Sequence, residues 1–90
     1  ANPQQAFHLY LQNSTYMKKY KNKHGNSGIL AYEAGDDFIE VLFSGNEVYI
    51  YNYENPGKAK VEKMKKLAIA GQGLSTYISQ EVKDTFYRKL

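Results

Sequence analysis

The sequence predicts a small α+β domain in which a three-stranded antiparallel β-meander is packed by two C-terminal helices, with an N-terminal helix or arm added. Three observations predict this class. Between residues 29 and 53 apolar side chains alternate with polar ones, which is the period of a strand. Two later segments carry apolar residues at helical spacing. The chain has 90 residues, of which 42% are apolar, so we expect one modest hydrophobic core.

The three strands are expected at residues 29–33, 38–43 and 47–53, because each segment is rich in β-branched or aromatic residues. Residues 35–37 and 44–46 separate them and supply the Gly, Asp and Asn that tight hairpin turns require. Consecutive strands joined by such short turns pair antiparallel, so the segment predicts a meander.

The third strand has two different faces. Successive side chains of a strand point to opposite sides of the sheet. Tyr49, Tyr51 and Tyr53 therefore share one face, and Val48 and Ile50 share the other. One of these two faces must meet the helices.

The first C-terminal helix is expected to have Asn55 as its N-cap, Pro56 at its first position and Gly71 as its stop. Its inward stripe consists of Val61, Met64, Leu67 and Ala68. A last helix, capped by Ser75, is expected to reach the end of the chain. Its apolar positions step by four and are Ile78, Val82, Phe86 and Leu90.

Residues 1–25 are assigned to the N-terminal helix or arm, and residues 26–90 to the main domain. Apolar residues near helical spacing predict a helix over residues 3–20. Residues 7–11 also alternate, so a strand is the alternative there. Residues 21–28 are polar, contain Gly and lack any period, which is typical of a linker.

Charge is segregated along the chain although the net charge is only +3. Residues 1–27 contain four Lys and no acid, residues 28–56 contain six acids and no Lys or Arg, and residues 57–90 contain eight basic and three acidic residues. Such a pattern produces a field with a positive and a negative lobe, which can orient a partner. Packing of opposite-sign elements side by side, as solvated faces, explains the same pattern.

Composition excludes several classes of protein. The chain has no Cys, so neither a disulfide framework nor a thiolate metal site is available. Its longest apolar runs fall far short of the roughly 20 residues that a membrane helix needs. No apolar signal segment leads the sequence. We therefore expect a soluble, cytoplasmic protein with no membrane partner.

The order of several short motifs over residues 26–90 is informative. A Ser-Gly-Ile start at 27–29 is followed by two Gly-containing turns, by Tyr49-Ile50-Tyr51, by a helix ending in Ala-Ile-Ala-Gly at 68–71, and by residues 73–78. This order resembles the KTSC domain, a small domain named for the C-terminal region of some lysyl-tRNA synthetases. The family also occurs as free-standing bacterial and phage proteins, and Tyr-x-Tyr is its best marker. The resemblance implies an RNA-binding candidate of unknown function without an established activity.

Tyr49 and Tyr51, the aromatics of that motif, allow two interpretations. On sheet-based RNA-binding proteins such rings form a platform on which unpaired bases stack. Alternatively, they pack beneath the helices with their hydroxyl groups at the edge, which is common for tyrosine. Glu47 and Glu54 flank the motif and favour packing, because a base platform needs nearby cations for the phosphates.

The basic residues of the C-terminal helices are the better nucleic-acid candidates. The first helix carries five lysines within about three turns, and the last segment adds three more basic residues that extend the patch if the two helices pack side by side. The eight candidates are Lys58, Lys60, Lys63, Lys65, Lys66, Lys83, Arg88 and Lys89. A charged face that serves only solubility is the alternative. Since seven of the eight are lysines, we expect backbone-directed, salt-sensitive binding.

No catalytic or metal-binding pattern is found in the sequence. His8 and His24 have no ligand partner at a metal-binding spacing, and Asp36-Asp37 is typical of a hairpin turn. No Ser has a partner His in a known motif, so we expect no enzyme and no cofactor.

The sequence thus favours a small non-enzymatic binding module that binds RNA through phosphate contacts on a basic helical face. The alternative is a protein-protein interaction domain, homo-oligomeric or hetero-partnered, that uses the Tyr-rich acidic sheet.

Overall fold

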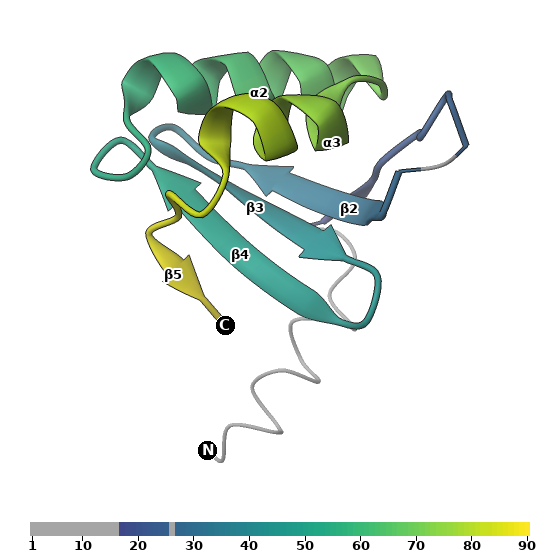
Figure 1. Ribbon diagram of the computed structural model, residues 1–90, viewed down its shortest axis with the longest axis horizontal. Coiled ribbons are helices and arrows are strands. Elements are labelled where there is room, and N and C mark those ends of the chain that lie inside the picture. The colour runs from purple at the N-terminus through teal and green to yellow at the C-terminus, as the bar shows by residue number, and fades with distance from the viewer. Residues whose placement is uncertain (1–16, 26) are drawn as a thin grey trace.

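The computed structural model describes residues 17–25 and 27–90. It is an α+β domain in which the helices lie on one face of an antiparallel sheet (Figure 1). Within these described residues, five strands lie in sequence order: β1 Lys18–Lys19, β2 Ile29–Ala34, β3 Phe38–Phe43, β4 Glu47–Asn52 and β5 Arg88–Lys89. The helices are α2 Lys58–Ala70 and α3 Leu74–Tyr77, and α3 continues into the π-helical turn η1 Ile78–Val82.

The predicted antiparallel strands are present as β2, β3 and β4, but the prediction of only three strands is wrong. Strand β1 pairs with the outer edge of β2, and β5 pairs with the outer edge of β4. Both additional strands have two residues, all basic. A strand of two residues is too short to show an alternation of apolar and polar side chains, so β1 and β5 cannot be recognised from the sequence.

The register of the sheet defines two faces. Tyr32, Val41 and Tyr49 lie opposite one another across β2, β3 and β4, and so their side chains share a face. This face, called here the helix face, packs against α2, α3 and η1. The neighbouring row contains Glu33 and Glu40, and it belongs to the opposite side, called here the far face.

The tyrosine side of β4 is therefore the side that meets the helices. Tyr51 is only 2% exposed and packs among apolar residues from every layer. The core that contains it consists of Tyr20, Ile29, Tyr32, Ile39, Val41, Tyr51, Val61, Met64, Ala68, Leu74, Ile78 and Val82. The predicted inward stripe of α2 is confirmed at its three buried positions Val61, Met64 and Ala68.

The predicted helix starts are wrong. Helix α2 begins at Lys58, and its N-cap position is Gly57, which has no side chain to cap it. Asn55 lies two residues before that position, and its side-chain amide donates a hydrogen bond to the Phe86 carbonyl at 2.9 Å. Helix α3 begins one residue before Ser75 and also lacks a side-chain cap. The predicted end of α2 is confirmed, since Gly71 follows Ala70 in the left-handed conformation.

The last helix does not reach the end of the chain. Helical structure stops at Val82, and Lys83 has a φ of 54°, which turns the chain back toward the sheet. Phe86 still packs against the core, but from a loop. The amides of Tyr87 and Leu90 then donate hydrogen bonds to carbonyls of β4. Apolar residues spaced by four predict a helix that continues to the end of the chain. The same spacing is also found when a shorter helix is followed by a loop that returns to the sheet and buries Phe86, so the pattern does not distinguish the two.

The predicted helix over residues 3–20 lies outside the described residues except for 17–20. There the chain contains β1 rather than helix, and the Tyr20 side chain lies in the core, 2% exposed. The predicted linker, residues 21–28, is the connection between β1 and β2. Within the described ranges, 17–25 and 27–90, none of the helices combines the length and the apolar character needed to cross a membrane.

Candidate functional site

Lys63 and Lys66 project from the outer side of α2. Since Val61, Met64 and Ala68 face the core and each residue turns the helix by about 100°, positions 63 and 66 point away from the sheet. Both side chains are exposed. Neither makes a hydrogen bond or an ion pair within the part of the chain that the structure describes. They are the α2 lysines most available to an external anion.

Two other lysines of α2 are engaged within the protein. The Lys60 ammonium donates a hydrogen bond to the Glu81 carbonyl at 2.6 Å, which joins α2 to η1. On the other flank, the Lys65 ammonium donates to the Asp36 carbonyl and to the Glu62 carboxylate, each at 2.8 Å. These two lysines therefore position α2 over the sheet and contribute less to an exposed cationic surface.

Tyr53 also takes part in the hydrogen bonds around Lys65 and Glu62. Its hydroxyl donates to the Glu62 carboxylate at 2.7 Å, and this bond raises the pKa of Tyr53 to about 12. Hydrogen bonds from Lys65 and then from Tyr53 lower the pKa of Glu62. Lys58 lies 5.8 Å from the centre of the Tyr53 ring, within the range of a cation-π contact. Glu62 is the only acid of α2, and its charge is thus neutralised on the side of the helix that faces away from η1.

The remaining three candidates do not join the outer side of α2. Lys83 follows η1 and lines a smaller hollow beside Tyr49. Arg88 lies opposite Ile50 on the far face, at the β5 edge. Lys89 lies 2.9 Å from Glu47 and 5.5 Å from the centre of the Tyr49 ring, and the hydrogen bond with Glu47 is the main reason that its pKa is raised. The structure therefore separates the eight basic candidates into several groups.

Tyr49 and Tyr51 lie beneath the helical layer. Burial is the main cause of the raised pKa of the Tyr51 hydroxyl. The Tyr49 ring is 6.4 Å from Tyr51, and it makes edge contacts with Phe43 at 5.4 Å and Phe86 at 4.9 Å. The Tyr51 ring leaves no face for a stacked base, so this geometry agrees with the packing interpretation.

Two lysines that were not among the candidates lie at the C-terminal end of α2. The Lys23 amide donates a hydrogen bond to the Gly71 carbonyl at 2.8 Å. Lys21 also lies beside Gly71, because a Cβ built on Gly71 would be 2.5 Å from the Cβ of Lys21. Both lysines are exposed. Gly71 follows Lys66 by about 7 Å of helical rise, so Lys21 and Lys23 extend the cationic surface of α2.

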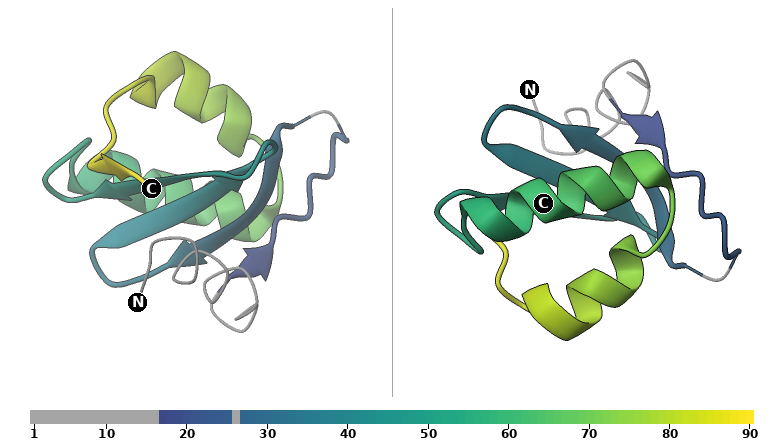
Figure 2. Two further views of the ribbon diagram at one scale, coloured as in Figure 1. Left: turned by 90° about the horizontal axis from the view of Figure 1, so that it is seen from below. Right: turned by 90° about the horizontal axis from the view of Figure 1, so that it is seen from above.

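We call Lys21, Lys23, Lys63 and Lys66 the lysine rim. Figure 2, from above, shows α2 beside α3 and η1, with the β1–β2 connection next to the turn between the helices. The sequence contained one signal for it, the four lysines without an acid in residues 1–27. The sequence alone places those lysines in a separate arm, because the pairing of β1 with β2 is not visible in the pattern.

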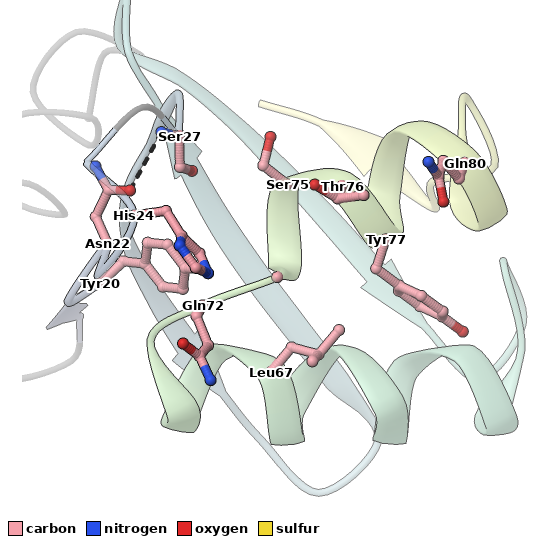
Figure 3. A pocket seen from close by; sticks show the side chains of 11 residues that line it. Tyr20, Asn22, His24, Ser27, Leu67, Gln72, Ser75, Thr76, Tyr77 and Gln80 are labelled. Carbon is pink, nitrogen blue, oxygen red and sulfur yellow. Dashed lines mark hydrogen bonds between the residues drawn. The ribbon is translucent and has the colours of Figure 1, made fainter.

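A hollow of about 780 Å³ lies where the β1–β2 connection, the end of α2 and α3 meet. Its volume is within the range of small-molecule sites, roughly 300–1,000 Å³. Figure 3 shows side chains of the β1–β2 connection on one side and those of α3 and η1 on the other. The lining residues are Tyr20, Asn22, His24, Ser27, Leu67, Gln72, Gly73, Ser75, Thr76, Tyr77 and Gln80.

Hydrogen bonds fix the walls of this hollow. The Asn22 side-chain oxygen accepts from the Ser27 amide at 3.2 Å, and the Ser27 hydroxyl accepts from the Ile29 amide at 3.0 Å. The Tyr20 hydroxyl accepts from the Leu74 amide at 3.3 Å and so joins β1 to the start of α3. The side chains of Gln72 and Gln80 have no hydrogen bond among the described residues. Their amide groups are available to a ligand.

Glu81 on η1 is an acid near the hollow, since burial and then the Glu81 charge raise the pKa of Tyr77, which lines the hollow. None of the eleven lining residues is itself Asp, Glu, Lys or Arg. Glu33 and Glu40 lie side by side on the far face, where burial and then the Glu40 charge raise the pKa of Glu33. Within residues 17–25 and 27–90, no group of three or more His, Cys, Asp or Glu side chains could hold a metal ion.

Comparison of the chain with models of protein families, with curated proteins and with solved structures finds no match.

Proposed function

We propose that this chain is a small non-enzymatic module that binds single-stranded RNA by phosphate contacts on its helical layer. The observation that carries the proposal is the lysine rim. Lys63 and Lys66 are exposed and have no partner among the described residues, and the Lys23–Gly71 hydrogen bond brings two further lysines to the end of the same helix. Lysine is suited to phosphate because it presents a compact charge without a fixed geometry.

The distribution of acids also supports the proposal. Glu62 is held on the opposite flank of α2 by Lys65 and Tyr53, and Glu33 and Glu40 lie on the far face. A polyanion that approaches the outer side of α2 therefore meets ammonium groups first. The resemblance of residues 26–90 to the KTSC domain is consistent with this proposal, because that family has been proposed to bind RNA.

The alternative, a protein-protein interaction domain that uses the Tyr-rich acidic sheet, has less support. The tyrosine side of β4 is packed beneath α2 and η1, so Tyr51 is not available to a partner. The two edges of the sheet are strands of two basic residues each, which limits sheet addition.

The first test measures binding of a fluorescent single-stranded RNA by anisotropy as salt is varied. Four phosphate contacts give a slope of log affinity against log salt of about −2.8, so a fourfold rise in salt weakens binding about 50-fold. The double variant Lys63→Glu and Lys66→Glu is expected to bind at least about tenfold more weakly, with a slope smaller by about 1.4.

The matched control for this prediction is the double variant Lys19→Glu and Arg88→Glu. It changes net charge by the same amount, but both residues are exposed at the edges of the far face. We expect the control to bind nearly as well as the wild type. Equal weakening by both double variants, or no binding of the wild type at low salt, would contradict the proposal.

A further inference from the structure

We propose that the hollow between the β1–β2 connection, α2 and α3 holds an unpaired nucleobase of the bound RNA. This inference rests on the proposed function and adds a second kind of contact to it. The lysine rim would hold phosphates without regard to sequence, whereas the hollow would distinguish single strands from duplexes. A base that is paired in a duplex cannot enter the hollow.

The lining of the hollow has the chemistry of a base site. Nucleobases are flat and uncharged, and their edges carry alternating donors and acceptors. The lining likewise offers amides that both donate and accept, from Gln72 and Gln80, and the hydroxyl groups of Ser75 and Thr76. An isolated anion or cation would find no opposite charge on the lining residues.

Stacking surfaces are available in the same hollow. His24, on the β1–β2 connection, is exposed and presents an aromatic ring without a hydrogen bond among the described residues. Leu67, partly buried on α2, provides an apolar surface at the bottom of the view in Figure 3. Aromatic rings that receive bases contribute substantially to the binding of single strands.

The position of the hollow relative to the lysine rim supports the same ligand. Lys63 precedes Leu67 by four residues, so the two side chains lie on one flank of α2, about 6 Å apart along the helix. On the other wall, Lys23 immediately precedes His24, and the Lys23 amide is bonded to Gly71, the neighbour of Gln72. A nucleotide with its base in the hollow would have ammonium groups from both walls near its flanking phosphates.

The test compares a single-stranded RNA with a duplex of the same length, using the whole chain and the double variant His24→Ala and Gln72→Ala. Both residues are exposed, so the variant is expected to fold. We expect the wild type to prefer the single strand roughly tenfold, and the variant to lose that preference while its affinity for the duplex and its salt slope stay unchanged. Equal wild-type affinities for the two RNAs would overturn the inference.

A second measurement separates failure of this inference from failure of the proposed function. Nucleoside monophosphates are titrated while amide NMR signals are recorded. Shifts at Gln72, Ser75 and Thr76 are expected in the wild type, and those at Ser75 and Thr76 should disappear in the double variant, which replaces Gln72 itself. If RNA binds with the predicted salt slope but these amides do not shift, the base site is wrong and the phosphate interface stands. If they shift although RNA does not bind, the proposed function fails and the base site stands.

Discussion

Replacement of Tyr51 by alanine is expected to lower the free energy of unfolding by roughly 3–5 kcal/mol, the range for removal of a large buried ring. The Tyr51 ring lies between the sheet and the helices, 2% exposed, in contact with the main core. Surrounding side chains from several elements cannot all move to fill the space. Since small domains are stable by only about 5–15 kcal/mol, the variant should be largely destabilised. Urea unfolding followed by circular dichroism measures the effect.

Tyr51→Phe is the matched control, because the Tyr51 hydroxyl has no hydrogen bond among the described residues. It is expected to change the stability by less than about 1 kcal/mol near neutral pH and to leave RNA affinity unchanged. Burial raises the pKa of Tyr51, so above a pH of about 10 the unfolded tyrosine loses its proton first and the wild type loses stability relative to Tyr51→Phe. If Tyr51→Phe weakens RNA binding instead, the tyrosines act as a base platform after all.

Gly71→Ala is expected to be the second most damaging change. Gly71 has a φ of 76°, where a side chain costs about 1–2 kcal/mol. An added Cβ would also lie 2.5 Å from the Lys21 Cβ, which cannot move without the backbone of the β1–β2 connection. Gly45→Ala separates the two effects, because Gly45 has a φ of 88° and nothing within 4 Å of its Cβ position.

The difference between these two glycine variants measures the overlap at Gly71. We expect Gly71→Ala to cost about 1–3 kcal/mol more than Gly45→Ala in urea unfolding. Because the overlap pushes the β1–β2 connection away from α2, Gly71→Ala should also weaken RNA binding under conditions in which it remains folded. Equal stabilities of the two variants would show that Lys21 and Gly71 are not packed together.

The sequence predicts the middle of the fold well and its edges poorly. Alternation over residues 29–53 is long enough to define β2, β3 and β4, and the stripe of α2 with Gly71 defines one helix and its end. Strands β1 and β5 escape prediction because pairing of two charged residues depends on a partner edge and not on any local pattern. Alternation along β4 defines the tyrosine face, but packing decides which of the two faces of the sheet meets the helices.

The candidate site is predictable only in part for a similar reason. The pattern of α2 places lysines outside the core, and Lys63 and Lys66 are exposed there. It cannot reveal that Lys60 and Lys65 donate to backbone carbonyls of distant segments. Nor can it reveal that Lys23 lies against Gly71, because this contact joins residues that are far apart in the sequence. The hollow cannot be predicted from the sequence either, because it is formed by the packing of the β1–β2 connection, α2 and α3 against one another.

The most direct test of the central claim, that RNA binds the outer side of the helical layer, is a map of amide NMR shifts upon addition of single-stranded RNA. We expect the largest shifts at Lys63 and Lys66 and in the β1–β2 connection around Lys23. Shifts confined to the far face, around Glu33 and Glu40, or to the β5 edge would contradict it.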